Sequence, residues 1–396
     1  MNICFDVFGC RLNKAEALED EARALGNGHK IVKTHAEADL IVIRGCSVTG
    51  RAQHDCEQEI ARLKAKYPAK RIWIAGCLKD AKPLVIKRAT GAESGSPGVP
   101  MRTARAYLKV QDGCNSACTF CIVPKFRGKS RATAKAEVLD KARRFIAAGY
   151  QELVLTGCNL CQYPDFPGLV AELCALYPKC RVRLGSVEPG SVAERLVELM
   201  SSTPNLCRFL HLSIQSGSQM VLNEMRRPYS SRQVDALLAK AVALMPDIGL
   251  GCDLIAGFPG ETELDFGQSA SLITRFGIAN VHAFPYSERP GTLAAAMRGQ
   301  LPREVRRERA RQLAQLGERN RTRLLRKFVG KTVAVVAETR GDKQVAGWTG
   351  EYLWCEGVAL PGSAQKPPGG TDGYRRQLLK IKVGEVTARG LKGVIL

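Results

Sequence analysis

Three cysteines in one short loop constrain this chain more than any other feature of its sequence. Cys114, Cys118 and Cys121 follow the spacing C-x3-C-x2-C within KVQDGCNSACTFCIVPKFRGKS, residues 109–130. Three thiolates so close together can bind three irons of a cubane iron–sulfur cluster and leave the fourth iron without a protein ligand. An open position distinguishes a reactive metal site from a structural one, which needs a fourth ligand. No Cys or His follows until Cys158, so the spacing predicts a reactive cluster.

The residues around these cysteines suit such a site. Gly113 and Asn115 allow tight turns, and Phe120 can shield a cluster from water. Pro124 is expected to prevent a helix directly after the last cysteine. The alternative, three buried thiols that lie close by chance, is uncommon in proteins of reducing compartments.

Chain length and cysteine usage indicate a multidomain protein of a reducing compartment. A chain of 396 residues can form two or three domains that each bury a core. Fifteen cysteines without a secretory start favour metal or redox chemistry over a disulfide framework. No apolar run approaches the roughly 20 residues that cross a bilayer. We therefore expect a cytoplasmic protein that makes no use of a membrane.

Positive charge is concentrated towards the C-terminus. The formal net charge is +21, and residues 301–396 carry 20 Lys and Arg against nine Asp and Glu. This gradient is typical of proteins that bind a polyanion, and nucleic acid is the obvious partner. A basic surface that serves only solubility is the alternative.

Residues 1–88 alternate between apolar strands and helices, which predicts a small doubly wound α/β domain. Strands are expected at residues 3–8, 39–43 and 71–75, and Asn13 is expected to begin the helix after the first of them.

Each of these strands runs into a Gly-Cys pair, and the three cysteines are Cys10, Cys46 and Cys77. Ligands of open α/β sheets collect at the carboxyl edge of the strands. Three thiolates delivered to that edge predict a second metal site, unless they are unrelated buried cysteines. Cys4 and Cys56 lack this context and are expected in the core.

Residues 89–103 are rich in Gly, Ser and Pro and are expected to form a linker. Residues 104–300 then show six predicted strands separated by helices. Six such units are too few for a closed eight-stranded barrel, so we expect an open partial (β/α)6 barrel. Its active face should lie at the carboxyl ends of the strands, close to the first three cysteines.

The C-terminal quarter changes character twice. Residues 301–327 contain a strongly basic helix that is expected to pack through Val305, Leu313, Leu316 and Leu324. Residues 328–396 alternate short strands with glycine-rich turns, which predicts a small β-barrel. Its aromatic residues Trp348, Tyr352 and Trp354 can stack on unpaired RNA bases or belong to the core.

Taken together, these features resemble the radical SAM methylthiotransferase family. The resemblance is carried by the cysteine loop with Ile122-Val123-Pro124 and Arg127-Gly128, by FGCRLNKAE, IRGCSVT and AGCLKD, and by SVEP, HLSIQSGS and GFPGETELDF. Lys14 and Arg44-Gly45 depart from the usual family residues beside the first-domain cysteines. The resemblance covers essentially the whole chain.

The resemblance implies two 4Fe–4S clusters and S-adenosylmethionine as cofactors. The cluster on Cys114, Cys118 and Cys121 would chelate the amino and carboxylate groups of S-adenosylmethionine and cleave it to a 5′-deoxyadenosyl radical. The auxiliary cluster on Cys10, Cys46 and Cys77 would supply sulfur. The C-terminal β-barrel would be a TRAM domain, which binds RNA.

Polar residues at the predicted strand ends of the radical SAM core are candidate contacts to S-adenosylmethionine. They are Gly157, Ser186, Glu188, Ser213 and Gln215. Without the resemblance, a polar residue that ends a strand is more often a helix cap. Cys158 and Cys161 are not expected to bind a metal, and His211 is expected to orient strand-end polar groups.

Within the family, QDGC, HLSIQSGS and HAFPYSERPGT are most similar to the MtaB type. This type adds a methylthio group to C2 of N6-threonylcarbamoyladenosine in the anticodon stem-loop of tRNA. Three alternatives stay open: a MiaB-type enzyme acting on N6-isopentenyladenosine, a non-catalytic iron–sulfur RNA-binding protein, and a zinc-based RNA-binding protein.

Overall fold

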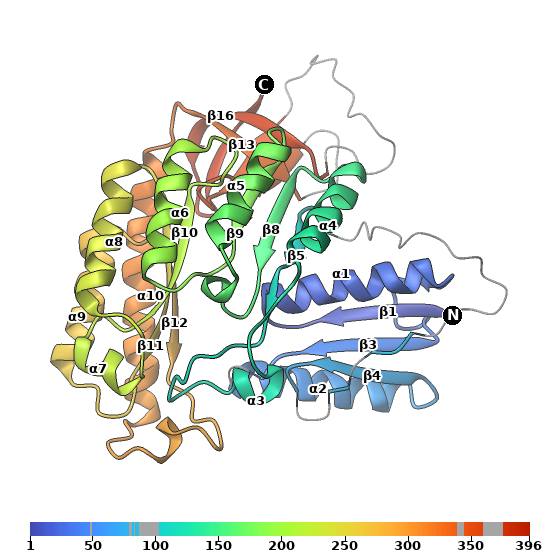
Figure 1. Cartoon of the computed structure of the whole chain (residues 1–396), viewed down its shortest axis with the longest axis horizontal. Coiled ribbons are helices and arrows are strands. Elements are labelled where there is room, and N and C mark those ends of the chain that lie inside the picture. Colours follow the sequence, from blue (N-terminus) through green and yellow to red (C-terminus); the bar gives the residue numbers. More distant parts are fainter. Residues whose placement is uncertain (48–49, 79–80, 83, 87–102, 339–343, 359–374) are drawn as a thin grey trace.

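The computed structural model describes residues 1–47, 50–78, 81–82, 84–86, 103–338, 344–358 and 375–396, which are the coloured parts of Figure 1. Apart from Thr103, the predicted linker over residues 89–103 lies outside the described residues. No helix in these described parts is both long enough and apolar enough to cross a membrane.

The N-terminal domain is a four-stranded parallel sheet with helices on both faces. Across the sheet, the strands are β2 (Lys30–Ile31), β1 (Asn2–Val7), β3 (Leu40–Gly45) and β4 (Arg71–Gly76). Alternate side chains of β1 and β3 pack towards α1 (Arg11–Gly26) and towards α2 (Gly50–Lys66). Because both faces are covered, β3 is buried along its whole length, as its apolar sequence predicts.

The prediction that Asn13 begins the first helix is wrong. The helix starts at Arg11, immediately after Cys10, and its first turn has no acidic residue. Asn13 is instead fully buried and donates to the carbonyl oxygens of Phe8 and Gly45, each at 2.8 Å. The asparagine joins two strand ends instead of capping a helix.

The central part contains six parallel strands in two adjacent sheets. One sheet holds β5 (Ala106–Lys109), β8 (Glu152–Thr156) and β9 (Arg181–Leu184), and the other holds β10 (Phe209–Gln215), β11 (Gly249–Ala256) and β12 (Asn280–Pro285). Isolated bridges between Val182 and Leu206 and between Val187 and Leu212 link the two sheets. The outer helices are α4 (Lys135–Ala147), α5 (Phe166–Leu176), α6 (Ser191–Ser202), α7 (Gln219–Glu224), α8 (Ser231–Leu244) and α9 (Glu263–Phe276).

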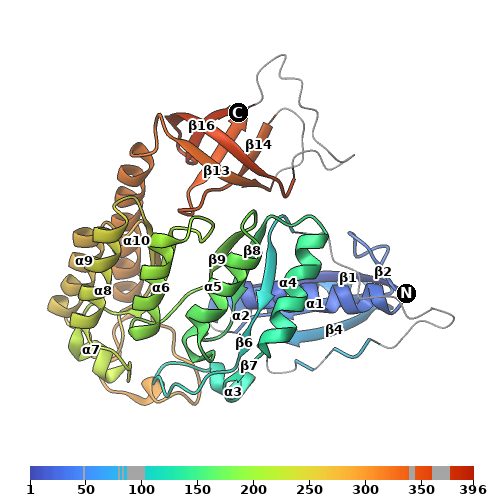
Figure 2. The ribbon, with the colours of Figure 1, turned by 45° about the horizontal axis from the view of Figure 1, so that its top comes forward.

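The long basic helix α10 (Arg303–Arg326) connects the central part to the C-terminal barrel (Figure 2). Leu313 and Leu316 pack into the central core, whereas Leu324 packs into the core of the barrel. The barrel is closed, and its strands are β13 (Thr332–Ala337), β14 (Gln344–Trp348), β15 (Trp354–Val358), β17 (Leu391–Ile395) and β16 (Leu378–Val386).

Both outer domains contact the central half barrel. Ala15 and Leu18 of α1 pack against Tyr107 and Val154 of the first edge of the half barrel. On the opposite edge, Arg289, in the loop after β12, donates to Gln53 of α2 at 2.5 Å. The N-terminal domain therefore contacts segments at both ends of the six-stranded array.

The C-terminal barrel docks through a buried ion-pair network. Arg181 donates to the carbonyl oxygens of Ala334 and Trp348, and Arg183 donates to those of Thr349 and Gly350. Both arginines also pair with the fully buried Glu152. Burial alone would raise the pKa of Glu152, but Arg181, Arg183 and Arg105 lower it to about 2. The carboxylate is therefore charged and holds both arginines towards the barrel.

Candidate functional site

The first cysteine loop lies between β6 (Gln111–Asp112) and α3 (Val123–Arg127). Gly113 has a φ of +69°, and a Cβ there would overlap the carbonyl oxygen of Lys129, so the turn requires glycine as predicted. The prediction that Pro124 prevents a helix directly after the last cysteine is wrong, because α3 begins at Val123, two residues after Cys121. Proline sits in the first turn of that helix, where its missing N–H costs no hydrogen bond.

The three thiols of this loop converge. The pKa of Cys121 is raised to about 11, mainly by burial, and the neighbouring Cys118 and Cys114 contribute to this rise. Burial also raises the pKa of Cys118, although Arg227 opposes it. Metal ligation deprotonates thiols outright, so three mutually repelling sulfurs fit a soft, thiophilic cation such as iron.

Arg227 is the main cation beside these thiols, and sequence reasoning missed it. Its guanidinium group donates to Cys118 Sγ at 2.9 Å, to Glu188 Oε1 at 2.6 Å and to the Tyr229 hydroxyl at 2.8 Å. It follows α7 and is far from the cysteine loop in sequence. Only its position in the motif EMRRPYS could have drawn attention to it.

Of the predicted strand-end residues, Glu188 is linked to the cysteine loop through Arg227, which donates to both Glu188 and Cys118. Its carboxylate accepts from Arg227 and, at 2.8 Å, from the Asn159 side chain. Asn159 also caps the short helix η1 (Leu160–Gln162), where its side chain accepts from the backbone N–H of Cys161.

The other four candidates occupy the same strand ends in different ways. Ser213 donates to Asp253 at 3.4 Å, and its carbonyl oxygen accepts from the Tyr229 hydroxyl at 2.6 Å. Gln215 has a φ of +70° beside an irregularity in the pairing of β10 with β11. Gly157 packs against Gln111, where a Cβ would lie 2.9 Å from its Oε1 atom.

Ser186 is half-buried next to Gly185 and Val187. None of the five candidates caps a helix in the described part of the chain. Their contacts to S-adenosylmethionine stay predictions.

The second cysteine set gathers at the carboxyl edge of the N-terminal sheet. Gly45 and Gly76 are paired in register, so Cys46 and Cys77 leave neighbouring strands at the same level. A Cβ on Gly9 would overlap Cys46, which places the segment before Cys10 against the same edge. Burial raises the pKa of Cys77, and Cys10 contributes to that rise. The residues present fit a thiolate-bound cluster.

Arg127 connects the segment of the first cysteine set to the second set. It ends α3, the helix that follows the first cysteine loop, and its Nε donates to Cys77 Sγ at 2.9 Å while its guanidinium donates to Asn13 Oδ1 at 3.2 Å. It also pairs with Glu16 at 2.8 Å and with Asp112 at 3.0 Å.

Glu16 anchors this arginine. Burial would raise the pKa of Glu16, but Arg127, Lys109 and Arg44 lower it to about 2. Arg44 stands where the family usually has a neutral residue, and it therefore adds a cation that pairs with Glu16. The sequence contained Arg127 in a recognisable motif, but nothing in it paired this residue with α1.

Two further cysteines, Cys158 and Cys161, lie near the site. Cys158 Sγ lies 3.5 Å from Asp112 Oδ1, whereas Cys161 Sγ lies 3.6 Å from the carbonyl oxygen of Glu188. Burial raises the pKa of both thiols. The two sulfurs contact different partners, and that they bind no metal stays a prediction.

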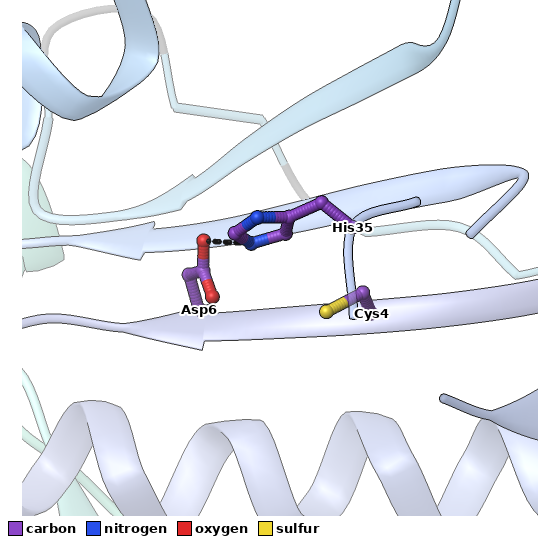
Figure 3. Close-up of side chains that lie close together, drawn as sticks. All are labelled: Cys4, Asp6 and His35. Carbon is purple, nitrogen blue, oxygen red and sulfur yellow. Dashed lines mark hydrogen bonds and ion pairs between the residues drawn. The ribbon is translucent and has the colours of Figure 1, made fainter. Parts of the chain in front are cut away.

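Two other groups of metal-type donors occur in the described residues. Figure 3 shows Cys4 and Asp6 on β1 beside His35, whose Nε2 lies 2.8 Å from Asp6 Oδ2. Cys4 is buried on the α2 face among apolar side chains, as predicted for a core residue. Asp6 and His35 form an ion pair with each other, so this group needs no metal to explain it.

The second group lies inside the half barrel. His211 Nε2 and His282 Nδ1 lie 3.1 Å and 3.2 Å from the same oxygen of Asp253. Asp253 also accepts from Ser213, which agrees with the prediction that His211 orients strand-end polar groups.

The aromatic residues of the C-terminal barrel pack against one another. Tyr352 stacks on Phe209 at 4.6 Å between ring centroids and on Trp348 at 4.4 Å. Trp354 meets Trp348 edge-on at 5.2 Å. The prediction of base stacking is wrong for Tyr352, because protein rings cover both of its faces.

Comparison with known proteins identifies the family. Residues 108–273 match the radical SAM superfamily, and residues 2–94 match the uncharacterized protein family UPF0004. Threonylcarbamoyladenosine tRNA methylthiotransferase MtaB of Chlamydia pneumoniae is 30% identical over 382 residues, which span 89% of this chain and 90% of the relative. The chain belongs to the radical SAM methylthiotransferase family. It is therefore an enzyme that uses a 4Fe–4S cluster and S-adenosylmethionine.

Other relatives place the chain within this methylthiotransferase family without separating its branches. The tRNA-2-methylthio-N(6)-dimethylallyladenosine synthase of Streptomyces griseus is 32% identical over 389 residues, covering 86% of this chain and 77% of the relative. The radical S-adenosylmethionine methyltransferase TsrM of Kitasatospora setae, in a structure with tryptophan and a SAM analogue, shares the fold with a TM-score of 0.53. That match has 12% identity and covers 74% of this chain and 75% of TsrM.

Proposed function

We propose that this methylthiotransferase adds a methylthio group to C2 of N6-threonylcarbamoyladenosine next to the anticodon of tRNA. The observation that carries the proposal is the Arg127 bridge. Arg127 lies on the helix that follows the loop of the first cysteine set and contacts Cys77 of the second set, so two clusters held there would act on one substrate atom. The MtaB relative of 30% identity supports the choice of base.

In this proposal each cysteine set holds its own 4Fe–4S cluster. Cys114, Cys118 and Cys121 would hold the first, and Cys10, Cys46 and Cys77 would hold the auxiliary one. When bound, these clusters and S-adenosylmethionine supply the sulfur, the methyl group and the radical that activates the base.

The surrounding side chains position these groups. Arg227 donates to Cys118 and to Glu188, so it couples the first cysteine loop to the strand end where S-adenosylmethionine is predicted to bind. A guanidinium beside a thiolate stabilises the charged sulfur. Arg127 has the same relation to Cys77.

The basic helix and the C-terminal barrel are the proposed surface for tRNA. Arg303, Arg307, Arg319 and Arg326 are exposed on α10 and make no ion pair among the described residues. Exposed guanidinium groups without protein anions favour phosphate contacts. A tRNA substrate also places the enzyme in the cytoplasm.

The competing substrate is N6-dimethylallyladenosine, the isopentenyl-type base, because the Streptomyces griseus relative is named for it at 32% identity. Nucleoside mass spectrometry of tRNA separates the two. Cells lacking the chain should lose 2-methylthio-N6-threonylcarbamoyladenosine and regain it on complementation. A matched Cys114→Ala copy should fail to restore it. Loss of the methylthio derivative of the isopentenyl-type base instead would refute the choice of substrate.

A further inference from the structure

Arg11 is a cation without a partner anion among the residues that the structure describes. It is the first residue of α1 and directly follows Cys10. Its guanidinium carbon lies 5.3 Å from the centroid of the Tyr352 ring. Phe209 and Trp348 also stack on that ring, and the positive charge of Arg11 contributes to lowering the pKa of the Tyr352 hydroxyl.

The neighbouring carboxylates are already taken by other arginines. Glu152 pairs with Arg181 and Arg183, and Glu338 pairs with Arg105 at 2.7 Å. Within the described residues, Arg11 forms no ion pair. A half-buried guanidinium without a counter-ion is costly, and a bound anion would relieve that cost.

The carboxylate of Asp253 does not supply that anion either, because two imidazoles contact it. His211 and His282 both lie next to Asp253 and use the oxygen that faces them. Arg11 also acts electrostatically on His211 and, together with burial, lowers the pKa of His211. Burial raises the pKa of Tyr352, but Arg11, Arg105 and Arg183 outweigh burial and lower it below its usual range. The space around the Tyr352 hydroxyl is therefore positive.

The position of Arg11 relates this positive space to the proposed reaction. Cys10 next to it is a predicted ligand of the auxiliary cluster, and Asp253 contacts Ser213 at the predicted S-adenosylmethionine face. C2 and N6 belong to the same side of the purine, on one six-membered ring. A base whose C2 reaches both cysteine sets must therefore direct its N6 substituent into the adjoining interior. A threonylcarbamoyl group ends in a carboxylate, whereas an isopentenyl group is neutral and apolar.

We propose that Arg11, with the Tyr352 hydroxyl, forms a carboxylate-binding subsite that recognises the charged N6 substituent of the target adenosine. This inference rests on the proposed function and names the residue that selects its substrate. Arginine suits the task because its planar fork matches a carboxylate. His282, whose side chain is 47% exposed, lies in the same interior on Asp253 and adds a polar group at its edge.

The test uses the anaerobically reconstituted full-length enzyme and three anticodon stem-loop RNAs. They carry N6-threonylcarbamoyladenosine, its threonine methyl ester, or N6-isopentenyladenosine. Fluorescence anisotropy measures the Kd of each RNA, and mass spectrometry measures methylthiolation. The wild-type enzyme should bind the free acid about tenfold more tightly than the ester, as expected for a charge-assisted hydrogen bond.

Three variants and one control define the outcome. Arg11→Gln should reduce the ester-to-acid ratio of Kd values from about ten to about one, Arg11→Lys should keep part of it, and Tyr352→Phe should reduce it by a smaller factor. Arg143→Gln, an exposed arginine on α4, should leave the ratio at its wild-type value. Thermal melting and iron content check that each variant is folded. If Arg11→Gln does not fold, Arg11→Lys and Tyr352→Phe still test the subsite.

A wild-type enzyme that binds acid and ester equally overturns the inference. So does a folded Arg11→Gln enzyme with the full ratio. Selective binding of the acid without methylthiolation of any RNA supports the subsite but contradicts the proposed function. Methylthiolation of the isopentenyl RNA with equal binding of acid and ester contradicts the subsite and the choice of base, while the family reaction stands.

Discussion

The two cysteine sets of this enzyme are assembled in opposite ways. Cys114, Cys118 and Cys121 belong to one loop, and a single glycine turn with φ of +69° brings them together. Cys10, Cys46 and Cys77 belong to three strand ends far apart in sequence, and they meet only because those strands are parallel and in register. The difference teaches that a thiolate site can depend on local backbone geometry or on the fold of a whole domain.

The largest expected effect separates the two sets by their chemistry. Alanine at Cys114, Cys118 or Cys121 should remove one cluster, about four irons per chain, and abolish cleavage of S-adenosylmethionine. Alanine at Cys10, Cys46 or Cys77 should remove the same amount of iron and abolish methylthio transfer while cleavage continues. Iron and sulfide analysis with 5′-deoxyadenosine detection measures both. Retention of two clusters in a Cys114→Ala, Cys118→Ala, Cys121→Ala triple variant would contradict the assignment.

The next effect concerns the residue that links the sets. Arg127→Ala leaves Glu16 buried beside fewer cations, which should lower the free energy of unfolding by about 3 kcal/mol. It should also reduce methylthio transfer more strongly than S-adenosylmethionine cleavage, because Arg127 contacts Cys77 of the second set and, through Glu16, anchors the helix next to the first set on α1. Chemical denaturation and product analysis measure the two effects.

Arg127→Lys is the matched control for this link, because it keeps the charge but loses the fork that reaches several partners. Its stability should lie between those of the wild type and Arg127→Ala. Equal loss of transfer and cleavage in both variants would show that Arg127 does not distinguish the two sets.

A smaller effect depends on pH. The pKa of Glu16 is about 2 in the folded enzyme, whereas a solvated glutamate in the unfolded chain has a pKa of about 4.5. A lowered folded pKa stabilises the protein above pH 4.5, and this stabilisation of at most about 3 kcal/mol disappears as the pH falls from 4.5 towards 2. Denaturation of wild type and Glu16→Gln at several pH values checks this. Their difference in unfolding free energy should shrink towards acid, and a constant difference would contradict it.

The smallest effect is expected from the cysteines that belong to neither set. Cys158→Ser and Cys161→Ser should change iron content by less than one atom per chain, since each thiol contacts protein atoms of the site margin. Cys4→Ser serves as a buried control outside the site. Loss of a whole cluster on mutation of Cys158 or Cys161 would show that one of them is a ligand.

Periodicity and spacing predicted much of the fold. The apolar run before Cys46 became a strand buried on both faces, and the six predicted central strands became two parallel sheets in one array. The small barrel at the C-terminus was also predicted from its short strands. These features depend on local patterns of apolar residues, which a sequence displays directly.

Three local predictions failed, two of them because a side chain has its partners elsewhere in the fold. Asn13 was expected to begin a helix but joins the ends of two strands. Pro124 was expected to prevent a helix but occupies the first turn of one. Tyr352 was considered as a base-stacking residue but lies between Phe209 and Trp348. In the first and third cases the partner is distant in sequence, so no local rule could have found it.

By itself, the sequence determined where the cysteines stand, in one loop and in glycine-cysteine pairs after strands, and these local properties predict which thiols bind metal. Only the tertiary structure decided which charges serve those thiols. Arg127 reaches Glu16 and Cys77, and Arg227 reaches Cys118, across long stretches of chain. Ion pairs and hydrogen bonds act over a few ångströms in space, whatever the separation along the chain, and the fold alone sets those distances.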